Sequence, residues 1–158
     1  MKTKQIISTG LLLFAAGSVV YMFTQQQKPG NTESVDLEPA IAAAMQDGIV
    51  MYYFSQGKEC STCDKLESYS HETLHTYFKD DIEAQSMAWR KVDLDDPEHE
   101  HFVTDFDLFS KSIVLVEYRG GEQIRWNNLT EIWDLVFEKQ GFLEYIRAET
   151  QGFKDASP

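Results

Sequence analysis

Six consecutive apolar residues in the first half of the chain limit what it can fold into. Residues 49–54 read IVMYYF, a run rich in β-branched and aromatic side chains and bounded by Gly48 and Ser55. A strand that is apolar at every position must be covered on both faces, because successive side chains point to opposite sides of a sheet. We therefore predict a strand over residues 49–54 that is buried on both faces.

Helix and strand patterns alternate along the rest of the chain. The order is a helix followed by β-α-β-α-β-β-α, which predicts an α/β protein with a mixed four-stranded sheet. The first two strands should run parallel and the last two should form an antiparallel hairpin. This is the order of the thioredoxin fold. Helices are expected at residues 37–46, 60–78, 96–106 and from 127–128 to 148, and strands at residues 49–54, 89–94, 113–118 and 122–126.

Single residue types predict several local details of the helices. The first core helix is expected to break near Ser68–Ser70 and to turn Tyr77 towards the core. Asn127-Asn128 should cap the last helix, because asparagine accepts hydrogen bonds from free N–H groups at a helix start. Gly141 should interrupt that helix, since glycine is unfavourable within helices.

A Cys-x-x-Cys motif follows the first expected strand directly. Cys60 and Cys63 are the only cysteines of the chain, and their spacing at a helix start brings the two sulfurs close enough to bridge. Free N–H groups and the helix dipole at that place stabilise a thiolate. We predict that Cys60 is the exposed nucleophile and Cys63 the resolving thiol of a catalytic thiol–disulfide centre. Two other interpretations stay open: a static disulfide that fixes the helix start, and a copper or zinc site formed by both thiolates.

A resemblance to a known family adds to this prediction. It is carried by the segments YYF, CSTCDKLESY, AWRKVDLDDPEHEHFVTDF, SKSIVL and RWNNLTEIWDL, between about Val50 and Phe153. These segments resemble the thioredoxin-fold proteins known as the ArsF-like subunit of a nitrophenyl-compound nitroreductase. The resemblance implies a membrane-tethered thioredoxin-like redox protein, with Cys60 and Cys63 matching the family's cysteine pair. No cofactor is expected, because the sequence contains neither a glycine-rich phosphate loop nor a flavin fingerprint.

The charges beside the motif differ from those of ordinary thioredoxins, which have tryptophan before the first cysteine. This chain has Glu59 there, and Glu59 and Asp64 should raise the pKa of Cys60. Lys58 and Lys65 oppose them. The sequence around the motif therefore does not fix whether the protein is an oxidant or a reductant.

Two prolines of ordinary thioredoxins are missing. Ser61-Thr62 stands where they have Gly-Pro, and Ser112 stands where they have a cis-proline facing the cysteines. We expect a trans peptide bond before Ser112, because a cis bond without proline costs about 3 kcal/mol. Ser112 is the expected substrate contact, with an altered peptide clamp, and the missing proline also leaves room for a metal beside the thiolates.

His71, Glu72 and His75 match H-E-x-x-H, a signature of zinc hydrolases in which both histidines bind zinc and the glutamate activates water. A third protein ligand would have to come from residues 98–101. The segment is, however, the expected second half of the first core helix, with both histidines at the border of its buried face and Glu72 pointing outwards. We therefore expect two partly exposed histidines here and no metal site.

The N-terminal region predicts a membrane anchor. Lys2 and Lys4 precede an uncharged segment, Ile6–Phe23, that would span roughly 27 Å as a helix. We predict a single transmembrane helix, an uncleaved signal-anchor, with the N-terminus in the cytoplasm and the C-terminal domain in a bacterial periplasm or at the cell surface. The expected organisation is a cytoplasmic segment at 1–5, the transmembrane helix at 6–23, a flexible linker at 24–36, the thioredoxin-like domain at 37–153 and a tail at 154–158.

The net charge restricts the partners. The chain carries 26 acidic and 14 basic residues, a formal net charge of −12. This argues against nucleic acid, which selects basic surfaces, and against a domain that lies on anionic lipid. The expected partners are the cysteines of another protein or a redox enzyme.

Overall fold

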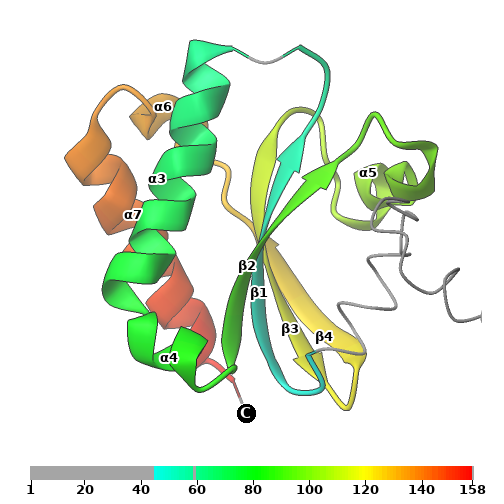
Figure 1. The fold of residues 1–158 in the computed structure, drawn as a ribbon, viewed down its shortest axis with the longest axis vertical. Helices are drawn as coiled ribbons and strands as arrows, with labels where there is room; N and C mark the ends of the chain where they lie inside the picture. The colour runs from blue at the N-terminus through cyan, green and yellow to red at the C-terminus, as the bar shows by residue number, and fades with distance from the viewer. Residues whose placement is uncertain (1–44, 59, 158) are drawn as a thin grey trace, which may run out of the picture. The chain divides into compact units, whose positions relative to one another are not determined.

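The computed structural model describes residues 45–58 and 60–157 and has a mixed four-stranded sheet at its centre. The strand order is β2-β1-β3-β4, with β1 pairing parallel to β2 and antiparallel to β3, and with β3 antiparallel to β4 (Figure 1). Both the mixed sheet and its C-terminal hairpin confirm the prediction. The strands are β1 (Gly48–Ser55), β2 (Met87–Asp93), β3 (Ser112–Arg119) and β4 (Glu122–Asn128).

Helices lie against both faces of this sheet. Among the described residues, four helices pack on one face of the sheet, and two short ones lie on the other (Figure 1). Together with the strand order, this arrangement is a thioredoxin-like fold. The first face carries α3 (Ser61–Tyr77), α4 (Lys79–Glu83), α6 (Ile132–Leu135) and α7 (Lys139–Asp155), and the second carries η1 (Pro97–His99) and α5 (His101–Asp105).

β1 is buried on both faces, as predicted from its continuous apolar run. Each residue from Ile49 to Phe54 has at most 5% of its surface exposed. Because side chains alternate along a strand, β1 contributes to two separate clusters. Ile49, Met51 and Tyr53 pack with Leu66, Leu74, Phe142 and Ile146, and Val50, Tyr52 and Phe54 pack with Phe102 and Phe106.

The predicted break in the first core helix is wrong, because α3 runs unbroken from Ser61 to Tyr77. Ser70 is fully buried, and its hydroxyl donates to the carbonyl of Glu67 and accepts from the indole N–H of Trp89. The helix therefore satisfies this polar group without breaking. Tyr77 is 39% exposed and lies beneath the guanidinium of Arg147, so its predicted inward direction is also wrong.

The predicted cap at Asn127-Asn128 is wrong as well. Both residues belong to β4, where they pair with Leu115 and Val114 of β3. The helical region that follows consists of two helices, α6 and α7, and Gly141 lies in the first turn of α7. The Glu138 carboxylate accepts from the Gly141 N–H at 2.7 Å and caps α7. A Cβ atom at position 141 would lie 2.1 Å from that carboxylate, so glycine permits this cap.

Several predictions concern residues outside those described. They are the cytoplasmic segment at 1–5, the transmembrane segment Ile6–Phe23, the linker at 24–36 and the helix at 37–46 except for its last two residues. Within the described ranges, no helix has both the length and the apolar character needed to cross a bilayer.

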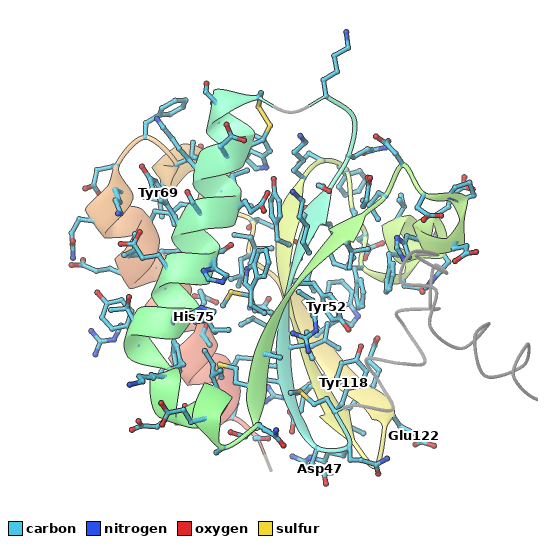
Figure 2. All side chains as sticks on the ribbon, viewed as in Figure 1. Asp47, Tyr52, Tyr69, His75, Tyr118 and Glu122 are labelled. Carbon is cyan, nitrogen blue, oxygen red and sulfur yellow. A yellow bond between two sulfur atoms is a disulfide. The ribbon has the colours of Figure 1, made fainter. Side chains whose placement is uncertain are left out.

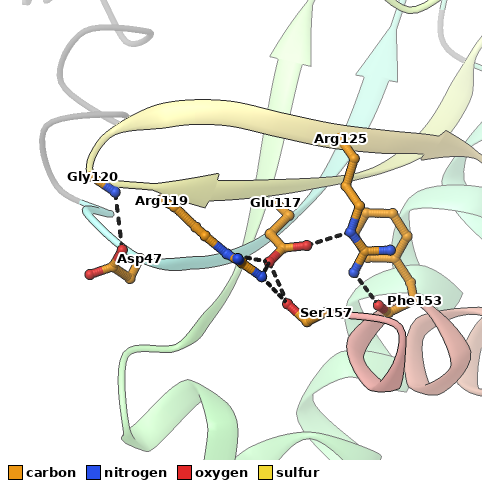
Figure 3. A network of polar contacts seen from close by, with 7 residues as sticks. All are labelled: Asp47, Glu117, Arg119, Gly120, Arg125, Phe153 and Ser157. Atoms are coloured by element: carbon orange, nitrogen blue, oxygen red, sulfur yellow. Dashed lines mark hydrogen bonds and ion pairs between the residues drawn. The ribbon is translucent and has the colours of Figure 1, made fainter.

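A buried carboxylate ties the C-terminus of α7 to the sheet. Glu117 of β3 is 3% exposed and accepts hydrogen bonds from Arg119, Arg125 and Ser157 (Figure 3). Arg125 also donates to the carbonyl of Phe153 near the end of α7. Burial alone would raise the pKa of Glu117, but the hydrogen bonds from Ser157, Arg125 and Arg119 outweigh it and hold the pKa below its usual value of 4.5.

We predict that Glu117→Gln lowers the free energy of unfolding at pH 7 by about 2–3 kcal/mol. The cost is below that of breaking a fully buried pair, because the side chains of Arg119 and Arg125 keep 39% and 27% exposure. The stabilisation by ionised Glu117 is present above pH 4.5 and is lost as the pH falls through the lower folded-state pKa, so the difference between the proteins should shrink in acid. Urea unfolding from pH 3 to 7 measures this, with exposed Glu122→Gln as the control; equal stability of all three proteins at pH 7 would contradict it.

Candidate functional site

The first turn of α3 places the two cysteines of the motif. Cys60 is the N-cap residue of the helix, with an extended backbone (φ −149°, ψ 155°). Its sulfur accepts a hydrogen bond from the Cys63 N–H at 3.2 Å, and its carbonyl accepts one from the Asp64 N–H at 3.0 Å. A sulfur at this position faces the free N–H groups of the helix, where negative charge is stabilised.

The two sulfurs are joined in a disulfide. The S–S distance is 2.09 Å and the two Cα atoms lie 5.0 Å apart; the bond is drawn in yellow beside the start of α3 (Figure 2). Cys60 is exposed, whereas Cys63 keeps only 5% of its surface exposed. A thiolate from solution can therefore reach the Cys60 sulfur much more easily than the Cys63 sulfur.

Two hydrogen bonds, one from β1 and one from the loop after it, hold the start of α3 in place. Near the end of the strand, the Tyr53 hydroxyl donates to the carbonyl of Cys63 at 3.2 Å. In the loop that follows, the Gly57 N–H donates to the Asp95 carboxylate at 2.7 Å. Gly57 has a φ of +65°, which glycine adopts without strain, and a link to the segment after β2 thus holds the loop.

Ser112 is the first residue of β3. It pairs with Phe54 of β1, and its peptide bond with Lys111 is trans, as expected. The side chain is 6% exposed, and its hydroxyl donates to the carbonyl of Ser110 at 2.9 Å. A contact of Ser112 with substrate stays a prediction.

Sequence reasoning missed Lys111, which precedes Ser112. Its ammonium donates to the carbonyl of Lys58 at 3.0 Å, two residues before Cys60. Its own carbonyl accepts from the indole N–H of Trp133 at 3.1 Å. The only signal in the sequence is a lysine before Ser112, the position where ordinary thioredoxins have a cis-proline, and the distance along the chain hides its contact with Lys58.

A charged cavity of about 390 Å³ lies next to Cys63. Lys111 lines one part of it, and Glu67 and Lys91, which form an ion pair at 2.7 Å, line another. Asp64, Asp93 and His99 also reach it. Basic and acidic groups therefore both line the cavity that Cys63 also lines.

The histidine pair of the H-E-x-x-H motif lies on the exposed side of α3. The rings of His71 and His75 stack at 3.9 Å between centroids, and the Nδ1 atom of His75 contacts the His71 carbonyl at 2.9 Å. Partial burial and the neighbouring His75 lower the pKa of His71, against an opposing effect of Glu67. Glu72 forms an ion pair with Lys139 at 2.8 Å.

These histidines lack a third ligand in the described part of the chain. No group of three or more histidine, cysteine, aspartate or glutamate side chains in residues 45–58 and 60–157 is arranged to hold a metal ion. Both histidines are exposed to solvent, so the prediction that they would not be buried is confirmed. The described residues therefore do not assemble the site that a zinc hydrolase requires.

Comparisons with known proteins give distant structural matches only. No family model and no curated protein matches the chain. Similar solved structures include the first two thioredoxin domains of Naumovozyma dairenensis Eps1p, with 17% sequence identity over 76% of this chain and 39% of that one and a TM-score of 0.41. Reduced Schistosoma mansoni thioredoxin pre-protein is similar too, with 16% identity over 66% of this chain and 90% of that one and a TM-score of 0.40. Oxidised Plasmodium falciparum thioredoxin is another, with 20% identity over 63% of this chain and 86% of that one and a TM-score of 0.37. The thioredoxin-like fold of this chain rests on its strand order and on the place of its cysteine pair.

We predict that, after reduction, iodoacetamide alkylates Cys60 roughly tenfold faster than Cys63, or more. The reason is the exposure of Cys60 at the helix start and the burial of Cys63 beneath it. Peptide mapping by mass spectrometry at timed intervals measures both rates. Equal rates are expected in guanidinium chloride, and equal rates in the folded protein would contradict the assignment.

Proposed function

We propose that this protein is a thiol–disulfide redox protein whose centre is the Cys60–Cys63 pair. The observation that carries the proposal is the unequal environment of the two sulfurs. One is exposed at the N-cap of α3 and accepts from the N–H of Cys63, and the other belongs to the buried Cys63, whose carbonyl accepts from the Tyr53 hydroxyl of the central strand. This asymmetry suits a pair in which one sulfur meets the partner and the other resolves the intermediate.

The exchange follows from this geometry. A partner thiolate attacks the Cys60 sulfur, the Cys60–Cys63 bond breaks, and Cys63 leaves as a thiolate. A second partner thiolate then attacks the partner sulfur of the mixed disulfide and releases Cys60 as a thiolate. Two electrons pass from the partner to Cys60 and Cys63, the partner gains a disulfide, and the reverse sequence reduces a partner disulfide.

The partner in this proposal is a cysteine-bearing protein or a redox enzyme. Exposed aromatic rings in contact with lysines of the surrounding segments support a protein partner. Trp133, 38% exposed, donates its indole N–H to the Lys111 carbonyl, and Phe137, 76% exposed, lies under the ammonium of Lys65. Phe109, two residues before Lys111, is 96% exposed. Such rings are common at the centres of protein–protein interfaces.

The cellular setting is part of the same proposal. The uncharged segment Ile6–Phe23 supports a single-pass anchor with the redox domain outside the cytoplasm, where a disulfide persists. The resemblance to the ArsF-like subunit of a nitrophenyl-compound nitroreductase supports a role as the redox subunit of a larger enzyme. On this proposal, the domain at 37–153 passes electrons to or from that partner through Cys60.

An equilibrium titration of the full-length protein against reduced and oxidised glutathione tests the function. We expect a reversible couple with a potential between about −120 and −270 mV, the range of thioredoxin-fold oxidoreductases. Thiol-specific labelling and mass spectrometry measure the reduced fraction, and Cys60→Ser is the control. A potential below about −300 mV would indicate a static structural disulfide. Stoichiometric copper or zinc that is lost in Cys60→Ser would instead support a metal carrier.

A further inference from the structure

Lys111 brings a positive charge to the redox centre from a distant part of the chain. Its ammonium donates to the Lys58 carbonyl at 3.0 Å, and its side chain lines the cavity that Cys63 also reaches. The Trp133 indole holds its backbone carbonyl at 3.1 Å. Lys111 is therefore fixed at both ends, between the loop that precedes Cys60 and the helix α6.

The ammonium of Lys111 differs from the other lysines near the motif in its surroundings. Within the described residues, it forms no ion pair with a carboxylate. The Lys65 ammonium lies over the ring of Phe137, 5.1 Å from its centroid. Lys91, on β2, is paired with Glu67 at 2.7 Å. Of these three cations, Lys111 is the one whose ammonium hydrogen-bonds the loop that leads to Cys60, and it has no carboxylate partner among the described residues.

Other charged groups face the same region. Asp64 lies in the first turn of α3, and Asp93 and His99 reach the cavity from β2 and η1. The Nδ1 atom of His99 contacts the Asp93 carbonyl at 2.8 Å, and the Asp93 carboxylate accepts from the Asp95 N–H at 3.1 Å. Lys58 and Glu59 are the charged neighbours of Cys60 in the sequence.

We propose that Lys111 is a positioning residue that stabilises the Cys60 thiolate and thereby makes the couple more oxidising. Reduction breaks the S–S bond and leaves the Cys60 sulfur negatively charged at the N-cap, where the Cys63 N–H already points at it. A fixed cation nearby lowers the free energy of that thiolate and leaves the neutral disulfide almost unaffected. Stabilising the reduced form in this way raises the reduction potential.

This inference rests on the proposed redox function and adds a direction to it. With Lys111 in place, the cysteine pair should accept two electrons from partner thiols more readily than it would without that charge. The expected partner is then a protein with two thiols, which the exchange oxidises to a disulfide.

Three full-length variants test the role of Lys111. In Lys111→Met, the equilibrium constant for reduction by glutathione should fall about three- to tenfold, where tenfold corresponds to about 30 mV. Lys111→Arg should stay close to the unmodified protein, because it keeps the charge. Lys65→Met removes a lysine that stands five residues after Cys60 and whose ammonium lies over the Phe137 ring. It should change the constant less than twofold, roughly the size of a screened surface charge effect. Circular dichroism checks that each variant is folded.

The pH dependence of Cys60 alkylation in the reduced proteins gives a second readout. Its midpoint should shift upwards in Lys111→Met and not in Lys111→Arg or Lys65→Met. Unchanged equilibrium and midpoint in Lys111→Met, or equal changes in Lys65→Met, would overturn the inference. If the unmodified protein did not exchange with glutathione, the proposed function would fail, while the alkylation midpoints would still decide the role of Lys111.

Discussion

The N–H group of Cys63 points at the Cys60 sulfur because Cys60 occupies the N-cap of α3. This contact depends on how β1 meets the helix. The strand is buried on both faces, so its position is fixed, and its Tyr53 hydroxyl holds the Cys63 carbonyl. The short loop after β1 then leaves Cys60 at the surface and Cys63 beneath it. The different roles assigned to the two sulfurs follow from this junction.

The strand order of the sheet determines which charges surround that junction. β3 pairs with β1 in a register that sets Ser112 opposite Phe54, so the residue before Ser112 arrives beside the loop that leads to Cys60. That residue is Lys111, and its ammonium bonds Lys58 in this loop. The charged neighbours of Cys60 in the sequence, Lys58 and Glu59, have opposite signs. The pairing of β3 with β1 adds the Lys111 ammonium, which is fixed by its bond to the Lys58 carbonyl.

The sequence predicted the parts of the fold that depend on local signals. The apolar run at 49–54 identified β1, and the cysteine pair directly after it located the helix start. Asn127-Asn128 was assigned wrongly because asparagine near a strand end and asparagine at a helix cap look alike until the pairing with β3 is known. α3 continues through Ser70, whose hydroxyl donates to the Glu67 carbonyl and accepts from the indole N–H of Trp89, 19 residues away. Lys111 could not be found for the same reason: its contact with Lys58 spans 53 residues.

Rapid reduction of the oxidised full-length protein by glutathione tests most directly whether Cys60–Cys63 is a working redox centre. Acid quenching at intervals and peptide mapping identify the sulfur that carries the mixed disulfide. We predict a transient glutathione adduct on Cys60, followed by the free dithiol. An adduct on Cys63, or a disulfide that persists in excess glutathione, would contradict the account.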